Sequence, residues 1–178
     1  RFENVFIAHA DVLAEPNEFA AYIQRIKSGF ILLQMGIGAG VIEGCLNVIR
    51  QSNIGAVAEV NAFLDDDEAS LRAELDAILA QTLPLTDAVY AGAISDEQRL
   101  QVLKLRLAAS ELALRAAQSA ALHAGAKGYQ VRHAAQRRTR EAMFVAIVTP
   151  AIKHLRKEIH ALEQASKSPA ETALEQAS

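Results

Sequence analysis

Apolar side chains recur with a helical period along most of the chain. From Phe19 to Ile49 they lie nearly all round the middle turns, a pattern typical of a helix that is central and buried. Four further periodic stretches predict helices at about 66–94, 96–124, 133–148 and 150–165. The pattern therefore predicts an all-α fold, a four- to five-helix up-and-down bundle with a short extended N-terminal segment.

Local signals predict where several of these helices begin and break. The stretch "SNIGAVAEVNAFLDDD" is the first predicted loop, and the acids Asp65 to Glu68 suit the positive end of the second helix. Pro84 predicts a kink or a short break in that helix near Leu83. "SDEQ", at Ser95 to Gln98, has the spacing of a capping box and predicts the start of the third helix.

Glycines predict a close helix contact and a corner. Gly36, Gly40 and Gly44 recur every four residues, so they form one stripe on which a neighbouring backbone could approach closely. "LHAGAKGYQ" ends the third helix, with Gly125 and Gly128 supplying the backbone freedom for the turn.

The two ends of the chain differ from the bundle at 16–165. "RFENVFIAHADVL" clusters apolar residues as an extended segment does and has no helix start signal, so we expect residues 1–15 to continue from an upstream part. Residues 166–178 are rich in Ser, Ala and Pro and predict a flexible tail.

Composition agrees with a helical bundle, and charge divides the chain into two halves. Residues are 51% hydrophobic and 5% aromatic, with no Trp, and the apolar content is mostly Ala, Leu, Ile and Val. The net charge is only −3, but residues 61–100 carry nine acids and two bases, whereas residues 101–160 carry eleven bases and three acids. The bend at Gly125 thus lies in a positive half that could meet an anion, or that forms a solvated face balancing the acidic half.

Several function classes are not expected from these residues. The lone Cys45 lies in an apolar segment, which favours a core thiol and a reducing, cytoplasmic compartment. The run Phe30 to Ile42 is interrupted by Gln34 and is too short for a bilayer span of about 20 residues, so no membrane association is expected.

Nucleic-acid and metal binding are not expected either. Arg137, Arg138 and Arg140 lie on one helix with little aromatic interleaving, a poor nucleic-acid footprint, so an anionic cofactor or a partner subunit's acids are favoured. The five histidines are scattered and predict no metal site.

Three segments in this order resemble one enzyme family. "FENVFIAHADVL" is followed by the small-residue-rich helix "MGIGAGVIEGCLNVI", and "GAKGYQ" is followed by "TREAMF". The order resembles the C-terminal helical domain of the acyl-CoA dehydrogenase family of flavoproteins. The resemblance implies that residues 1–15 end a preceding β-rich domain and that the bundle assembles with itself as a dimer or tetramer.

The resemblance also implies FAD binding. In that family the paired glycines of the turn approach the FAD pyrophosphate of a neighbouring subunit, and here these positions are Gly125 and Ala126. The family's FAD-contacting arginine after the first long helix falls on Gln51, with Arg50 one place away.

The family's catalytic base is missing. Proton removal beside the thioester carbonyl of an acyl-CoA substrate needs a carboxylate. Its usual position falls on Thr149, which is not expected to act as a base, and the alternative position near Phe30 has no Asp or Glu either.

Three functions stay open from the sequence. The first is an atypical acyl-CoA dehydrogenase-like FAD oxidoreductase, in which this domain contributes to FAD binding and oligomerisation. The second is a flavin-dependent monooxygenase of the same superfamily, some members of which lack the glutamate. The third is a non-catalytic helical assembly module.

Overall fold

The computed structural model describes residues 1–92 and 94–166, and these residues form helices joined by short connections, with no strand among them. The α-helices are α1 (Phe19–Ser52), α2 (Ala56–Asn61), α3 (Glu68–Tyr90), α4 (Asp96–Ala124), α5 (Ala134–Ile147) and α6 (Ile152–Ser166). Two 3₁₀ helices, η1 (His9–Asp11) and η2 (Gly125–Tyr129), complete the set. The predicted all-α bundle is confirmed.

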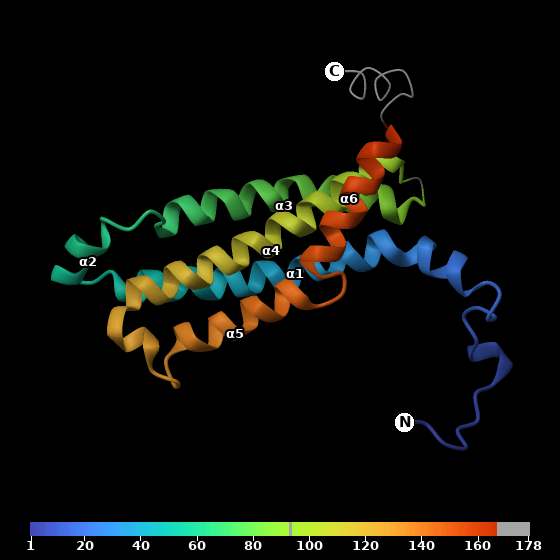
Figure 1. Ribbon diagram of the computed structural model, residues 1–178, viewed down its shortest axis with the longest axis horizontal. Coiled ribbons are helices and arrows are strands. Elements are labelled where there is room, and N and C mark those ends of the chain that lie inside the picture. Colours follow the sequence, from blue (N-terminus) through green and yellow to red (C-terminus); the bar gives the residue numbers. More distant parts are fainter. Residues whose placement is uncertain (93, 167–178) are drawn as a thin grey trace, which may run out of the picture.

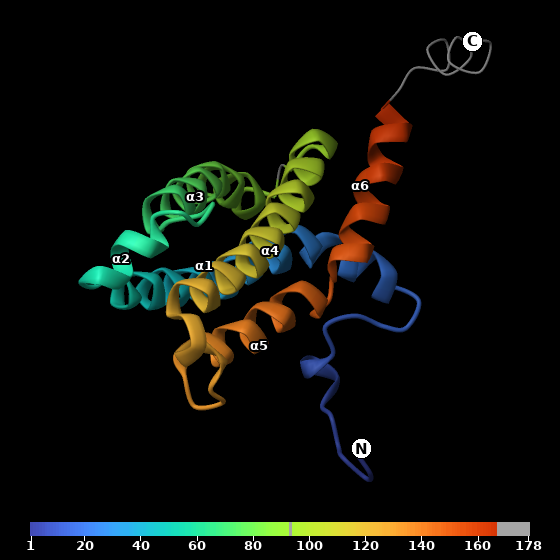
Figure 2. The same ribbon diagram turned by 60° about the vertical axis from the view of Figure 1, so that its left-hand side comes forward.

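Four long helices run alternately up and down. Figure 1 shows α1, α3, α4 and α5 side by side, while α6 leaves the bundle at a steep angle. Helices α1 and α4 form the central pair, and Figure 2 shows α3 and α5 on opposite sides of it. The core is aliphatic; among its fully buried members are Ile42, Leu46, Ile49, Leu71, Ala113, Ala116 and Leu155. Small Ala side chains of α4 and branched side chains of α1 belong to the same buried core, and these two helices pack against each other.

Helix starts were predicted well where a side chain caps the backbone. Helix α4 spans the predicted range, and its capping box is confirmed, since Ser95 Oγ accepts from the Gln98 N–H at 3.2 Å. A second capping box at α3, between Asp67 and Ser70, was not predicted. Hydrogen bonds from Ser70 lower the pKa of the Asp67 carboxyl, which keeps the cap ionised.

Three predictions about helix limits were wrong. The predicted loop contains α2, because Gly55 at φ +62° reverses the chain after α1 and its carbonyl accepts from the Ala58 N–H at 3.0 Å. Helix α1 runs to Ser52, three residues beyond the predicted end at Ile49. Helix α3 continues through Pro84 and packs against both α1 and α4, so of the predicted kink or short break there, the break was wrong.

The extended N-terminal segment is confirmed as irregular chain. Apart from η1, residues 1–18 form no regular element, and both views show them leading away from the bundle. Its large apolar side chains, Phe2, Phe6 and Leu13 among them, are exposed. The tail predicted at 166–178 lies outside the described residues except for Ser166, the last residue of α6.

Helix α1 is central but not buried all round. Its inner face lies in the core, whereas Phe30, Leu33 and Ile37 are exposed, Leu33 by 76%. An exposed apolar stripe cannot be distinguished from a buried one by periodicity, since both repeat with the helix. Cys45 lies on the inner face, as predicted, and burial raises the pKa of its thiol to about 12.

The glycine stripe on α1 does not receive a neighbouring backbone. A methyl group at Gly36 or Gly40 would meet nothing within 4 Å, whereas one at Gly44 would collide with the guanidinium of Arg138. Gly38, outside the stripe, is the glycine that packs against α4, near Ala109. The predicted close backbone contact was therefore wrong. Gly36 and Gly40 lie on an open surface, and Arg138 covers Gly44.

A buried arginine links the three helices α4, α1 and α5. Arg106 on α4 is 1% exposed, and its Nε donates to Gln34 Oε1 at 3.3 Å while Nη2 donates to the Val145 carbonyl at 2.9 Å. Nη1 donates to Ser110 Oγ. Gln34 Nε2 in turn donates to the Thr149 carbonyl at 2.8 Å. Burial lowers the pKa of Arg106, because this guanidinium has neutral acceptors instead of a carboxylate.

Replacing Gln34 by Leu is expected to lower the free energy of unfolding by about 2 kcal/mol. The substitution keeps the volume but leaves a buried donor of Arg106 and the Thr149 carbonyl without this partner. Urea unfolding of Gln34→Leu against the parent chain measures the effect. Gln101→Leu, at an exposed site on α4, is the matched control and should change stability by about 0.5 kcal/mol or less. Equal midpoints for the two variants would contradict the role of the network.

Alanine substitutions should separate the open glycines from the covered one. Gly40→Ala is expected to raise the free energy of unfolding by about 0.5–1 kcal/mol, since it improves helix propensity in open space. Gly44→Ala should give little or none of this gain, because the Arg138 guanidinium must move away. Denaturant unfolding of both variants makes the comparison, and an equal gain at the two positions would show that Arg138 does not pack on Gly44.

Candidate functional site

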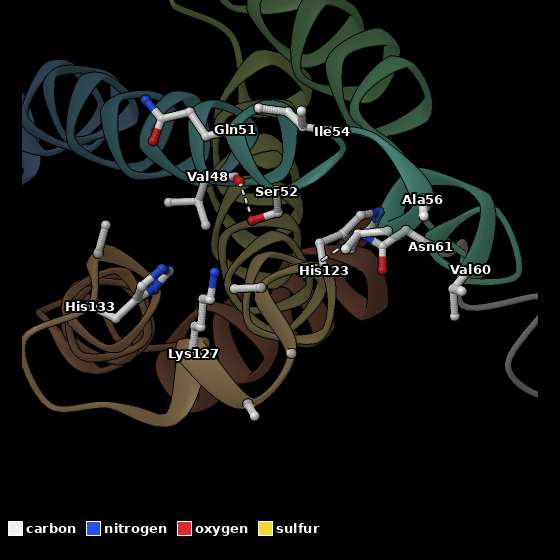
Figure 3. A pocket seen from close by; sticks show the side chains of 15 residues that line it. Val48, Gln51, Ser52, Ile54, Ala56, Val60, Asn61, His123, Lys127 and His133 are labelled. Carbon is white, nitrogen blue, oxygen red and sulfur yellow. Dashed lines mark hydrogen bonds between the residues drawn. The ribbon is translucent and has the colours of Figure 1, made fainter.

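A cavity of about 890 Å³ lies at the end of the bundle where α1 finishes and α5 begins (Figure 3). Helix α2 and the turn η2 close two of its sides. The lining is largely apolar, with Val48, Ile54, Val57 and Val60 on the α1 and α2 side. Gly55 builds this cavity, because the chain reversal there places α2 beside the end of α4.

The cavity brings together three of the four predicted FAD-contacting residues. Gln51, on the last turn of α1, and Gly125 and Ala126, in η2, all line it although they come from distant parts of the chain. Arg50 does not line it. Its Nε donates to Glu68 Oε1 at 3.0 Å on the side facing α3, and this hydrogen bond raises the pKa of Arg50.

The two glycines of the turn serve different purposes. Gly125 has a φ of +57°, which an L-residue rarely adopts, and its N–H donates to the Leu122 carbonyl. Gly128 has no positive φ; a methyl group there would lie 2.9 Å from the Ala121 carbonyl oxygen. The predicted need for glycine is supported at both positions, but at Gly128 its cause is close packing and not backbone freedom.

The cavity is positively charged. Lys127 is the formal cation among its lining residues, which include no Asp or Glu. Figure 3 shows the Lys127 ammonium directed from η2 towards α1, between His133 and Ser52. Ala134, the first residue of α5, also lines the cavity, so the start of this helix lies at the cavity. A helix start and an ammonium group without a facing carboxylate favour an anionic ligand.

Two histidines of the lining were not predicted. His133 caps α5, where its Nδ1 accepts from the Ala135 N–H at 3.2 Å. His123 is 2% exposed, and its Nδ1 lies 2.9 Å from the Ser119 carbonyl, which can only accept, so Nδ1 carries the proton. The His123 carbonyl accepts from Asn61 Nδ2 at 3.1 Å and so fixes α2 to the end of α4. The scattered positions of the histidines in the sequence did not indicate that His133 caps α5 or that His123 is buried at the end of α4.

Thr149 lies at a second, smaller pocket of about 360 Å³ near the other end of α1. Phe30 lines the same pocket, so the two positions where the resembling family places its base come together here. The lining is apolar apart from Gln24, Lys27 and Thr149, and it contains no carboxylate. Lys27 forms an ion pair with Glu158 of α6, which holds the nearby carboxylate in a structural contact.

The comparisons with known proteins add no family. No model of a known protein family matches the chain, and no curated protein is significantly similar to it.

Helix α1 also has the length and the apolar composition of a membrane-spanning helix. Within the described residues it is the helix whose length and apolar composition would allow it to cross a bilayer. Half of its most apolar window is buried inside the bundle, and core helices of soluble proteins share these properties. The absence of membrane association therefore stays a prediction.

Proposed function

We propose that this chain is the C-terminal helical domain of an acyl-CoA dehydrogenase-like FAD oxidoreductase and that the cavity beside η2 contributes to FAD binding. Gln51 meets Gly125 and Ala126 around one cavity that has a cation and no facing acid, and this arrangement supports the proposal. In the family that the chain resembles, the same positions contact FAD.

The cavity residues fit the pyrophosphate end of such a cofactor. Lys127 and the start of α5 would balance phosphate charge, and the aliphatic wall of Ile54, Val57 and Val60 would pack against an adenine ring. The Gly125 N–H already donates to Leu122, so the N–H groups after it are the ones that could face a phosphate. Bound flavin supplies hydride acceptance or, when reduced, reaction with oxygen.

The pocket at Thr149 favours oxygen chemistry over dehydrogenation. Dehydrogenation of a thioester needs a carboxylate to remove the proton, and the pocket offers a hydroxyl, an amide and a paired lysine. Flavin-dependent monooxygenation does not need this base. A flavin monooxygenase of the same superfamily is therefore the second candidate, and self-association through the bundle is proposed for both.

Purified chain is expected to bind FAD and to show its visible absorption bands after excess cofactor is removed. Lys127→Ala should weaken binding about tenfold, the loss typical of one charge-assisted contact. Lys153→Ala, an exposed lysine of α6 far from the cavity, is the matched control and should bind as the parent does. Fluorescence titration with FAD measures both. No binding at any FAD concentration would reject the flavoprotein and leave the non-catalytic assembly module.

Anaerobic mixing of the flavin-loaded protein with acyl-CoA thioesters distinguishes dehydrogenase activity from monooxygenase activity. We expect no bleaching of the flavin bands, because the Thr149 pocket lacks a carboxylate. Reduced flavin should instead be reoxidised by oxygen in the presence of protein. Bleaching by an acyl-CoA would contradict the monooxygenase and require a base outside this pocket.

A further inference from the structure

A groove of about 600 Å³ lies between α1 and α5, separate from the two pockets described above. Its floor is the open glycine stripe of α1, where Gly36 and Gly40 have no side chain to fill the space. Ile37, Val41 and Phe144 form apolar walls. Phe144 is 53% exposed, so its ring is accessible from the groove side of α5.

Three arginines of α5 line this groove with a single carboxylate. Arg137 Nε donates to Glu141 Oε1 at 2.7 Å, and Arg138 donates to the other oxygen of the same carboxylate. Arg140 donates from Nη1 to the Gln136 carbonyl at 3.1 Å and has no ion pair among the described residues. Burial raises the pKa of Glu141, but Arg137 and Arg138 outweigh it and hold the pKa below its usual value. The ionised Glu141 leaves two positive charges of the groove uncompensated.

The arginines of α5 are not balanced by acids near the start of their helix. They follow a first turn that contains no acid, and Glu141 is the acid that pairs with two of them. Arg138 also has a buried Nε without a hydrogen-bond partner, above Gly44. An unpaired buried donor costs about 1–3 kcal/mol. Because this Nε is covered at Gly44, the exposed Arg137 and Arg140 are the arginines that can face an anion in the groove.

We propose that the groove binds a phosphomonoester whose organic part is apolar. A phosphomonoester carries about two negative charges near neutral pH, which matches the uncompensated charge of the groove. Guanidinium forks bind phosphate oxygens in pairs, and Arg140 offers free donors for this. The glycine floor leaves room for the organic part beside Ile37 and Phe144.

The groove ligand differs from the proposed cofactor. FAD has no terminal phosphate, and its two negative charges are divided over a pyrophosphate with one charge on each phosphorus, whereas a phosphomonoester carries about two charges on one terminal phosphate. The residues of the groove and of the FAD cavity do not overlap. A chain that fails to bind FAD could therefore still bind the phosphomonoester in the groove. A chain that fails to bind the phosphomonoester could likewise still bind FAD.

Calorimetric titration of the full chain with phenyl phosphate, inorganic phosphate and phenol tests the proposal. We expect one site per chain, with phenyl phosphate binding at least tenfold more tightly than either fragment alone, since the groove contacts both parts. Arg140→Ala should weaken phenyl phosphate about tenfold. Arg99→Ala is the matched control; this arginine is also exposed near a helix start, where it pairs with Asp96, and its loss should leave binding unchanged.

Gly40→Leu is a variant that should block the groove without lowering the stability of the fold. The position has open space and leucine favours helix, so the variant should unfold no more easily than the parent while its side chain fills the groove floor and abolishes binding. Unchanged binding in Gly40→Leu, an equal loss in Arg99→Ala, or no saturable binding of phenyl phosphate would overturn the proposal.

Vesicles distinguish a soluble phosphomonoester from a lipid headgroup. Phosphatidic acid carries the same phosphomonoester, and phosphatidylcholine vesicles are the control. Flotation with phosphatidic acid that phenyl phosphate displaces and Gly40→Leu abolishes would assign the site to the lipid source. Phenyl phosphate binding without flotation would assign it to a soluble ligand. Flotation that Gly40→Leu retains would contradict a role of the groove.

Discussion

The guanidinium of Arg106 is the interaction on which the rest of the bundle depends. A charge in an aliphatic core is strongly unfavourable unless every donor finds an acceptor. Here the acceptors come from α1, from α4 itself and from the last turn of α5, and they can meet only in one relative register of these helices. The buried charge therefore selects one arrangement, and through Gln34 it also holds the Thr149 carbonyl at the second pocket.

The same interaction marks the limit of sequence-based reasoning. Helical periodicity predicted the long helices, and the Ser95 capping box predicted where α4 begins, because both signals are local. Arg106 was one of the eleven bases counted in residues 101–160, and Gln34 was treated only as an interruption of an apolar run. The hydrogen bond between Arg106 and Gln34 depends on how α4 packs against α1, and no local sequence pattern predicts this packing. Helix α2 was missed for a related reason, since its tie to the rest of the fold is the hydrogen bond from Asn61 to the His123 carbonyl at the end of α4, which joins residues distant in the sequence.

The candidate site was predicted in part. The resemblance to a flavoprotein family singled out Gln51, Gly125 and Ala126, and these residues do share one cavity. Arg50 faces away because Glu68, a distant residue in the chain, binds its side chain. Lys127 and the two histidines line the cavity because of the geometry of η2, the start of α5 and the end of α4, which supplies His123. Charge counting predicted a positive region, but only the structure separates it into a cavity at one end and an arginine groove along the side.

The length of α1 has a consequence for how an enzyme of this kind could work. Gln51 and Phe30 lie at two separate pockets on the same rigid rod, and the rise of a helix puts them about 32 Å apart along its axis. One extended dinucleotide does not cover that distance. A flavin whose nucleotide end lies beside Gln51 could therefore reach the Thr149 pocket only in another subunit. Turnover would then require the assembled oligomer. Diluting the protein until its subunits dissociate would stop turnover before any helix unfolds.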